Sequence, residues 1–298
     1  MAESELLRGV YNVAPTPFHP NGDVDEPSIK RLTDFLVDRG VDGITILGIM
    51  GEAAKVSDVE RERIVARFIE AAEGRTPICV GTSHAATNRC VAFSKQAELM
   101  GAKSVMVAPP KLNRSSDEAL RKHYLAVAEA IDIPVVIQDY PGTSGIYMSP
   151  SFISQIADEA PQCRFIKLED EPTPLKITKV LSLNPGLKVF GGSGGMMFLE
   201  ELIHGAIGIM TGFAFSEVLV DVYRKFTEGD IDGAMEVFHR YCPIIRFENQ
   251  PAIGLALRKY VYYKRGAITS PSVREPYVPI DDATIADLNR VLASLHLL

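Results

Sequence analysis

A lysine and a glutamate stand two residues apart in the short segment FIKLED, residues 165–170. Lys167 interrupts an apolar run typical of a β-strand, at a position where a core side chain is expected. Because alternate residues of a strand point to the same side, Glu169 is predicted to share the face of Lys167. The alternative is that the strand has ended, with Lys167 reaching water and Glu169 capping a helix or pairing on the surface.

A buried lysine amine can attack a ketone and form an imine while the amine is neutral. An apolar pocket favours the neutral amine because burial destabilises a charge. Phe165, Ile166 and Leu168 supply apolar neighbours. The protonated imine makes the adjacent carbon acidic, so aldol cleavage, condensation and elimination of water become accessible. Each reaction also needs a proton carrier, for which Glu169 is the candidate.

The elements that would position this pair repeat one pattern along the chain. A short apolar run is followed by a Gly, Pro or polar turn and then by an amphipathic stretch. The runs are GVYNVAP, DGITILG, PICVGTS, SVMVAPP, PVVIQDYP, FIKLED, LKVFGGS and AIGIMTG. Helices are predicted between them, for example over residues 26–39, 58–73 (with Ser57 as N-cap), 87–100 and 116–131.

Eight strand–helix units predict a (β/α)8 TIM barrel, with an open doubly wound sheet as the runner-up. No GxGxxG fingerprint follows the first strand. We expect the barrel over residues 1–215, and a C-terminal helical appendage packed on it over residues 216–298, as a single structural unit. Function in such barrels lies at the carboxyl ends of the strands. Lys167, at the end of the sixth strand, is then predicted to point into a cavity above the barrel.

The composition narrows the class of partner. The net charge is −7, without a basic cluster, which disfavours nucleic acid and anionic membrane surfaces. The N-terminus lacks a signal-peptide pattern, no segment is apolar enough to cross a bilayer, and the four cysteines are scattered. The histidines lack ligand-like spacing. We therefore expect a cytoplasmic protein without metal or cofactor that acts on a small molecule.

The glycine-rich loop GGSGG, residues 191–195, offers a rival interpretation. Many barrels bind phosphate through backbone amides after the seventh strand, so the substrate or a cofactor could carry phosphate. The basic residues expected near this mouth are only Arg164 and Lys167. We favour a loop that lies beside the lysine and leaves room for substrate, with Ser193 and Gly194 as contacts.

Several motifs resemble the dihydrodipicolinate synthase/N-acetylneuraminate lyase superfamily of Schiff-base barrel enzymes. They are APTPF with NGDVD, GIMGEAAKVSDVER, PICVGTS, APPKLN, YPGTSG and the lysine of FIKLED, and they span nearly the whole chain. The resemblance implies a barrel, an imine on Lys167, a 2-keto acid such as pyruvate as substrate, and a homotetramer arranged as a dimer of dimers.

The chain departs from the family pattern at the mouth of the barrel. Ile49 and Met50 stand where family members carry two hydroxyl residues, although backbone N–H groups around Gly51 could still bind a carboxylate. Gln138 stands where a proton-relaying tyrosine is usual, and Leu112 replaces an aromatic residue. Thr143 replaces the synthase's arginine. These departures disfavour the synthase reaction itself.

One branch, the 2-keto-3-deoxy-pentonate (L-2-keto-3-deoxyarabonate) dehydratases, is similar in TSH, QD, K-x-E, MTG and the late EN. The second loop differs from that branch as well. The predicted catalytic residues are Lys167, Glu169 and Tyr140, the last either facing the site or turned outward by Pro141. The predicted substrate contacts are Met50, Gly51, Ser83, His84, Gln138, Ser193, Gly194 and Thr211. We expect the polar residues of FENQ, residues 247–250, to pack at a helix or subunit contact.

The sequence therefore predicts a Schiff-base lyase, with dehydration of a 2-keto-3-deoxy sugar acid as the favoured reaction. Pyruvate-dependent aldol cleavage and dihydrodipicolinate-type condensation are alternatives within the enzyme class. A keto-acid-binding protein without turnover is the alternative from another class, suggested by the missing hydroxyls and tyrosine.

Overall fold

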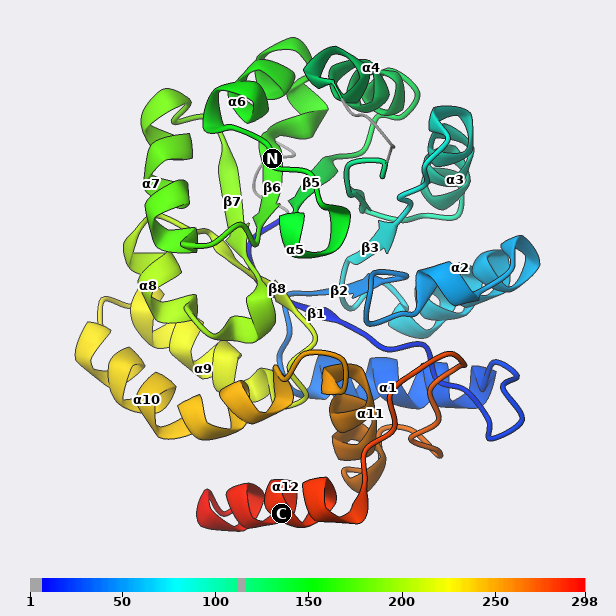
Figure 1. Ribbon diagram of the computed structural model, residues 1–298, viewed down its shortest axis with the longest axis vertical. Coiled ribbons are helices and arrows are strands. Elements are labelled where there is room, and N and C mark those ends of the chain that lie inside the picture. The colour runs from blue at the N-terminus through cyan, green and yellow to red at the C-terminus, as the bar shows by residue number, and fades with distance from the viewer. Residues whose placement is uncertain (1–6, 112–115, 298) are drawn as a thin grey trace.

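The computed structural model describes residues 7–111 and 116–297 of the chain. Eight parallel strands close into a barrel in sequence order, with β1 paired to β8 (Figure 1). This confirms the predicted TIM barrel and excludes the open sheet. The strands are β1 (Gly9–Val13), β2 (Gly43–Ile46), β3 (Ile78–Gly81), β4 (Ser104–Val107), β5 (Val135–Asp139), β6 (Phe165–Leu168), β7 (Lys188–Gly191) and β8 (Gly208–Thr211).

Alternation along each strand divides the core in two, as a closed parallel barrel requires. One apolar cluster fills the barrel interior and includes Tyr11, Met106, Phe165 and Phe190. A larger cluster lies between the strands and the surrounding helices. In β6, Phe165 belongs to the interior cluster, whereas Ile166 and Leu168 belong to the outer one. Lys167 therefore shares the inward face of Phe165, and only Phe165 of its three apolar neighbours lies on that face.

Helices surround the barrel and connect successive strands. Helix α2 begins where the sequence predicts, because Ser57 accepts from the N–H of Glu60 and the Glu60 carboxylate accepts from the N–H of Ser57. The helices up to β8 are α1 (Glu26–Asp38), α2 (Asp58–Ala72), α3 (Thr87–Leu99), α4 (Asp117–Ala128), α5 (Pro141–Ser144), α6 (Pro150–Glu159), α7 (Thr173–Leu183) and α8 (Phe198–Ile203), with short 3-10 turns η2 (Ala53–Lys55), η3 (Pro161–Arg164) and η4 (Ser193–Gly195).

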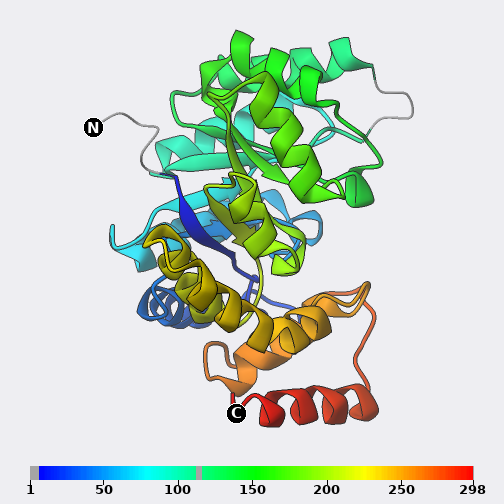
Figure 2. The same cartoon turned by 90° about the vertical axis from the view of Figure 1, so that its left-hand side faces the viewer.

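Four helices follow β8: α9 (Ser216–Thr227), α10 (Ile231–Glu248), α11 (Gly254–Lys264) and α12 (Asp282–Ser294). Helix α9 packs against β1 and against α10, so it covers the junction where the barrel closes. Helix α12 contacts α10 and lies at the edge of the molecule, away from the strands (Figures 1 and 2). No helix in the described ranges is both long and apolar enough to cross a membrane.

Candidate active site

Lys167 and Glu169 lie together at the mouth of the barrel. The Lys167 Nζ is 2.9 Å from Oε2 of Glu169, and both side chains are buried. Strand β6 ends at Leu168, but the N–H of Glu169 still donates to the carbonyl of Asp139, which continues the pairing with β5 by one residue. This added pairing holds Glu169 in the extended course of the strand, so its carboxylate points to the same side as the lysine.

Two further groups orient the Glu169 carboxylate. The Gln138 amide donates to Oε2 at 3.0 Å, and the backbone N–H of Ser193 donates to Oε1 at 2.9 Å. Gln138 lies beside Lys167 in the β5–β6 register. A Cβ at Gly192 would come within 2.4 Å of the Glu169 side chain, so this glycine leaves room for the glutamate itself. The structure thus brings together the predicted Lys167, Glu169, Gln138 and Ser193.

The remainder of the glycine loop is occupied by a residue from the C-terminal helices. The Asn249 amide donates to the carbonyl of Ser193 at 3.2 Å. At Gly194, where φ is +71°, a Cβ would come within 2.2 Å of Asn249. The polar FENQ segment therefore packs on the mouth of the barrel, and the glycines at 192 and 194 admit protein side chains at the positions where we expected substrate.

Arg258, which was not predicted as a site residue from the sequence, extends this connection toward the second loop. Its Nη2 donates to Asn249 Oδ1 at 3.2 Å, and its Nη1 contacts the sulfur of Met50 at 3.4 Å. Glu248 lies 3.6 Å from its Nε, and burial raises the pKa of that carboxyl to about 7. The available signal was the pair Arg258–Lys259 inside the apolar stretch AIGLALRKYVYY of α11.

The second loop places Met50 at the mouth and Ile49 outside it. Met50 is buried and lies against Gly212, where a Cβ would come within 2.6 Å of its side chain, whereas Ile49 is 53% exposed. Among the described residues, no hydrogen bond reaches the backbone N–H of Met50 or Gly51. The carbonyl of Gly51 accepts from the Thr16 hydroxyl at 2.7 Å. The loop thus retains free backbone donors beside a thioether.

The other predicted site residues lie farther from the lysine–glutamate pair. Ser83 is exposed, and its hydroxyl accepts from the N–H of Ala108, which ties the ends of β3 and β4 together. His84 is also exposed, accepts from the N–H of Ala86 through Nδ1, and sets its ring edge against Phe93. Neither contacts Lys167 or Glu169. The contacts of Ser83 and His84 show that both residues stabilise the loops in which they lie.

Tyr140 and Thr211 lie at strand ends and form no hydrogen bond to Lys167 or Glu169. Tyr140 is half-buried, and its ring lies against Gly142. Its hydroxyl forms no hydrogen bond within residues 7–111 and 116–297. Thr211 is buried at the end of β8, in register with Asn12. Thr143 is exposed in α5, and Leu112 lies outside the described residues.

Three lysine side chains are buried in the described part of the chain, and two of them are saturated. Lys176 lies within 2.7 Å of the Met148 carbonyl, Asp139 and Asp170. Burial nevertheless raises the pKa of Asp139 to about 6, with Lys176 opposing the shift. Lys259 contacts Glu52 at 2.5 Å and the carbonyl of Ser272 at 2.7 Å, and its third N–H direction meets the Phe18 ring, whose centre is 4.4 Å from Nζ. Lys167 has Glu169 as its single partner among the described residues, so two of its three N–H directions are free for a ligand.

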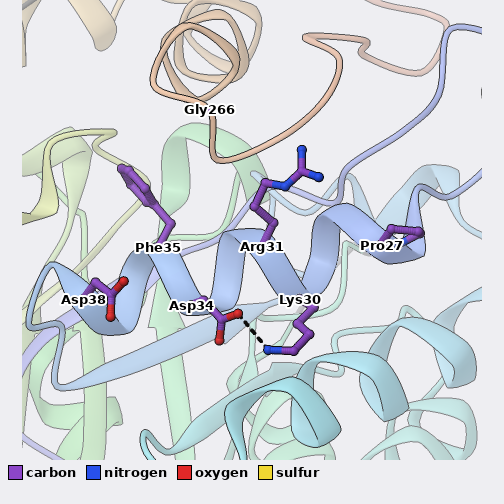
Figure 3. A pocket seen from close by; sticks show the side chains of 7 residues that line it. All are labelled: Pro27, Lys30, Arg31, Asp34, Phe35, Asp38 and Gly266. Carbon is purple, nitrogen blue, oxygen red and sulfur yellow. Dashed lines mark hydrogen bonds and ion pairs between the residues drawn. The ribbon is translucent and has the colours of Figure 1, made fainter.

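A shallow hollow of about 450 Å³ lies on the outside of the barrel (Figure 3). It runs along α1 toward Gly266 and includes Lys30 and Asp34, which pair at 2.7 Å. Lys30, Arg31 and Asp38 are exposed and Asp34 is half-buried, and none of the predicted site residues lines the hollow. The chemistry therefore belongs to the barrel mouth.

The geometry also bears on the phosphate interpretation of the glycine loop. The N–H of Ser193 already donates to the Glu169 carboxylate, and the N–H groups of Gly195 and Met196 donate within the loop. A phosphate in this loop would meet the negative charge of Glu169. Arg164 does not help, since it precedes β6 and is exposed at the opposite end of the barrel; its predicted position near the mouth was wrong. The arrangement favours an amine that reacts with a carbonyl beside a carboxylate.

Comparisons with known proteins agree with this chemistry. The model of the dihydrodipicolinate synthetase family matches residues 6–295. The chain is 32% identical over 287 residues to L-2-keto-3-deoxyarabonate dehydratase of Azospirillum brasilense, covering 94% of this chain and 92% of the relative. It is 28% identical to 4-hydroxy-tetrahydrodipicolinate synthase of Thermotoga neapolitana, covering 98% and 100%.

A solved structure extends the relation to the fold. The crystal structure of dihydrodipicolinate synthase from Rhodopseudomonas palustris superposes with a TM-score of 0.91 at 36% identity, covering 97% of each chain. Together with the match over residues 6–295, this shows that the chain belongs to the dihydrodipicolinate synthetase family and is a lyase of that family.

Proposed function

We propose that this lyase dehydrates a 2-keto-3-deoxy sugar acid through an imine on Lys167. The observation that carries the proposal is the single partner of Lys167. Of the three buried lysines of the described chain, it alone keeps free N–H directions, and it does so at the carboxyl end of a barrel strand. The relation to the Azospirillum dehydratase supports this choice of reaction.

The steps follow from the chemistry of the imine. The Lys167 amine adds to the C2 ketone, and the oxygen leaves as water. Glu169 then takes a proton from C3, which gives an enamine, and the enamine expels the C4 hydroxyl as a second water with a proton returned by the acid. Hydrolysis of the imine consumes one water, so the net reaction is the loss of one water. A carboxylate 2.9 Å from the amine is close enough to reach a carbon attached to the imine carbon.

The surroundings of Tyr140 favour elimination over aldol cleavage. Cleavage requires a base at the C4 hydroxyl, which the family supplies with a tyrosine at the position of Gln138. Here the Gln138 amide donates to Glu169, and the Tyr140 hydroxyl has no hydrogen bond to a described residue. Elimination needs only the carboxylate that the site holds in place.

The reaction is tested by product analysis with a panel of 2-keto-3-deoxy pentonates and hexonates. A dehydrated keto product without pyruvate supports the proposal; with a pentonate this product is a semialdehyde. Pyruvate measured with coupled lactate dehydrogenase would establish cleavage instead. Ligand-induced thermal stabilisation without any product would establish a keto-acid-binding protein.

We also propose that the chain forms a homotetramer, as the family resemblance implies. Sedimentation analysis tests this directly, with a tetramer expected at micromolar concentration. A cytoplasmic location, the absence of a cofactor and the division into a barrel over residues 1–215 and helices over 216–298 stay predictions.

A further inference from the structure

Lys176 lies behind the reactive pair, on the outer side of the barrel wall. It belongs to α7, the helix that follows β6, and its side chain is buried. Its Nζ donates to the carbonyl of Met148 and to Oδ2 of Asp170, both at 2.7 Å, and lies 2.6 Å from Oδ2 of Asp139. An ammonium group has three N–H donors, so these three contacts leave it no free direction.

The two aspartates come from neighbouring strands, near the point where each strand ends. Asp139 is the last residue of β5 and pairs in register with Leu168, the last residue of β6. Leu168 belongs to the outer apolar cluster, so Asp139 also points away from the barrel interior. The contact with Lys176 places the Asp170 carboxylate on the same outer side. The ammonium group therefore joins the ends of β5 and β6 from outside the barrel.

Glu169 adjoins both of these aspartates. Its N–H donates to the carbonyl of Asp139 at 2.8 Å, and Asp170 is the next residue of the chain. Gln138, whose amide donates to the Glu169 carboxylate, directly precedes Asp139. A shift of either aspartate would therefore move the Glu169 carboxylate relative to Lys167.

The carboxylate of Asp139 depends on Lys176. It is fully buried, and no other described residue donates a hydrogen bond to either of its oxygens. Burial raises the pKa of Asp139 to about 6, Lys176 opposes this shift, and the negative charge of Glu169 adds to it. The Asp139 and Glu169 carboxylates therefore act on each other through the barrel wall. Because an unpaired buried carboxylate is costly, loss of the ammonium group should displace or neutralise the end of β5.

We infer that Lys176 is a positioning residue that joins the ends of β5 and β6 and thereby holds the Glu169 carboxylate at C3 of the imine. This inference rests on the proposed function, since C3 is the carbon from which Glu169 takes a proton. Lys167 lies inside β6, in register with Gln138 and Phe190 on both neighbouring strands, whereas Glu169 lies beyond the last register pair. Lys176 therefore acts on elimination and not on imine formation.

The inference is tested by measuring imine formation and proton transfer separately. Imine formation is followed as borohydride-trapped adduct against pyruvate concentration, and proton transfer as exchange of the C3 protons of pyruvate in deuterated water, observed by NMR. For Lys176→Met, the half-saturating pyruvate concentration should stay within about twofold of wild type, while exchange should slow roughly 30-fold, because a small displacement of a catalytic group is costly. In dehydration, kcat should fall by a similar factor with KM nearly unchanged. Lys176→Arg keeps the charge and should recover part of the exchange rate.

A role through Glu169 is distinguished from a general structural role by combining two substitutions. Exchange is already slow in Glu169→Gln, and adding Lys176→Met should slow it by less than about twofold further, because the group that Lys176 positions is gone. Equal slowing by Lys176→Met in the wild-type and Glu169→Gln backgrounds would overturn the inference. Unchanged exchange in Lys176→Met would overturn it as well.

Lys259→Met is the matched control. Lys259 is also buried and also contacts a carboxylate and a backbone carbonyl, those of Glu52 and Ser272. Its replacement should lower the unfolding midpoint without changing the exchange rate per folded molecule. Circular dichroism confirms that each variant is folded.

Asp170→Ala decides the role if Lys176→Met does not fold. The Asp170 side chain is partly exposed, so its removal takes away the β6 contact of Lys176 and leaves the contact with Asp139. Exchange that slows about threefold with unchanged adduct trapping would support the inference. Exchange at the wild-type rate would overturn it.

Failure of the proposed function would be visible separately. If wild type traps no adduct, the imine is wrong, and crystal structures of wild type and Asp170→Ala decide the positioning role. A Glu169 carboxylate that leaves the Gln138 amide and the Ser193 N–H in the variant would support that role, whereas unchanged contacts would overturn it. If wild type traps pyruvate without exchanging its C3 protons, Glu169 does not move that proton, and the inference is overturned.

Discussion

Lys167 and Lys259 each pair with a glutamate inside the protein, at 2.9 Å and 2.5 Å. The surroundings of the two ammonium groups differ. Lys259 also donates to the carbonyl of Ser272, and its Nζ lies 4.4 Å from the centre of the Phe18 ring, so each N–H direction has a partner. Lys167 has Glu169 alone among the described residues. Burial and a carboxylate partner are common to both lysines, and the number of unfilled donor directions distinguishes the reactive one.

The two glutamates also differ in the partners that their carboxylates have. Glu52 accepts from Lys259 and Lys55 and from the N–H of Arg274, which ties the second loop to the chain that follows α11. Glu169 accepts from one amide and one backbone N–H, and its Oε2 faces a lysine that is free to react. The first pair fixes the C-terminal helices on the barrel, and the second is suited to move a proton.

Replacement of Lys167 by methionine should have the largest effect on activity. We expect dehydration to fall by roughly three orders of magnitude or more, because no imine forms. Stability should change by less than about 2 kcal/mol, since Glu169 keeps two N–H donors and an unsaturated ammonium is removed. Steady-state kinetics and urea unfolding measure the two quantities. Substantial activity in the Lys167→Met variant would show that Lys167 is not the reactive lysine.

Replacement of Lys259 by methionine should have the opposite effect, with a loss of stability and little change in imine formation. The substitution breaks a buried ion pair and also leaves the carbonyl of Ser272 without its donor, so the free energy of unfolding should fall by about 3 kcal/mol or more. The folded fraction should still form the borohydride-trapped adduct at a rate close to that of wild type. Urea unfolding and intact mass check this, and a Lys259→Met protein as stable as wild type would show that the pair does not hold the appendage.

Replacement of Glu169 by glutamine should separate imine formation from elimination. The amide keeps the size of the side chain but cannot accept the C3 proton, so dehydration should fall by about a hundredfold. Adduct trapping should persist. Exchange of the C3 protons of the bound keto acid, followed by NMR in deuterated water, should slow in parallel. Loss of trapping with unchanged exchange would assign Glu169 to the amine instead of to C3.

The smallest effect is expected from a buried carboxyl without a lysine. Glu201 accepts from the Thr173 hydroxyl at 2.6 Å, and burial raises the pKa of its carboxyl to about 8. Because the folded value exceeds the unfolded one, near 4.5, its contribution to stability is complete below about pH 4.5 and is lost as the pH rises toward 8. Between pH 6 and pH 7, the unfolding free energy of wild type should therefore fall by about 1 kcal/mol more than that of the Glu201→Gln protein.

The pH dependence of the unfolding free energy that remains in the Glu201→Gln protein serves as the control. Burial raises the pKa of Glu248 to about 7, so the Glu201→Gln protein should still lose some stability over the same range. Identical pH profiles for wild type and Glu201→Gln would show that this carboxyl does not titrate with folding.

The fold and the centre of the site were predictable because both depend on local patterns. Eight apolar runs and the intervening amphipathic stretches indicate the barrel, and alternation along one strand places Lys167 and Glu169 on one face. The hydrogen-bond partners of Glu169 were harder to predict from the sequence. Gln138 and Ser193 were named as substrate contacts, but their hydrogen bonds to Glu169 depend on the register of β5, β6 and β7.

Arg258 could not be placed from the sequence for a related reason. Its contact with Met50 joins positions 208 residues apart. A helical pattern shows that α11 is apolar with two charges, but not which element those charges reach. Likewise, glycines at 192 and 194 indicate close approach without naming the neighbour, and that neighbour proved to be Glu169 or Asn249.

The central claim is that Lys167 alone forms the imine, and reductive trapping tests it most directly. Wild type, Lys167→Met and Lys259→Met are incubated with pyruvate and with a panel of 2-keto-3-deoxy acids, reduced with borohydride, and analysed by intact mass and peptide mapping. We predict one adduct per chain on wild type and Lys259→Met, mapped to Lys167, and none on Lys167→Met. An adduct that persists in Lys167→Met, or the absence of any adduct on wild type, would contradict the account.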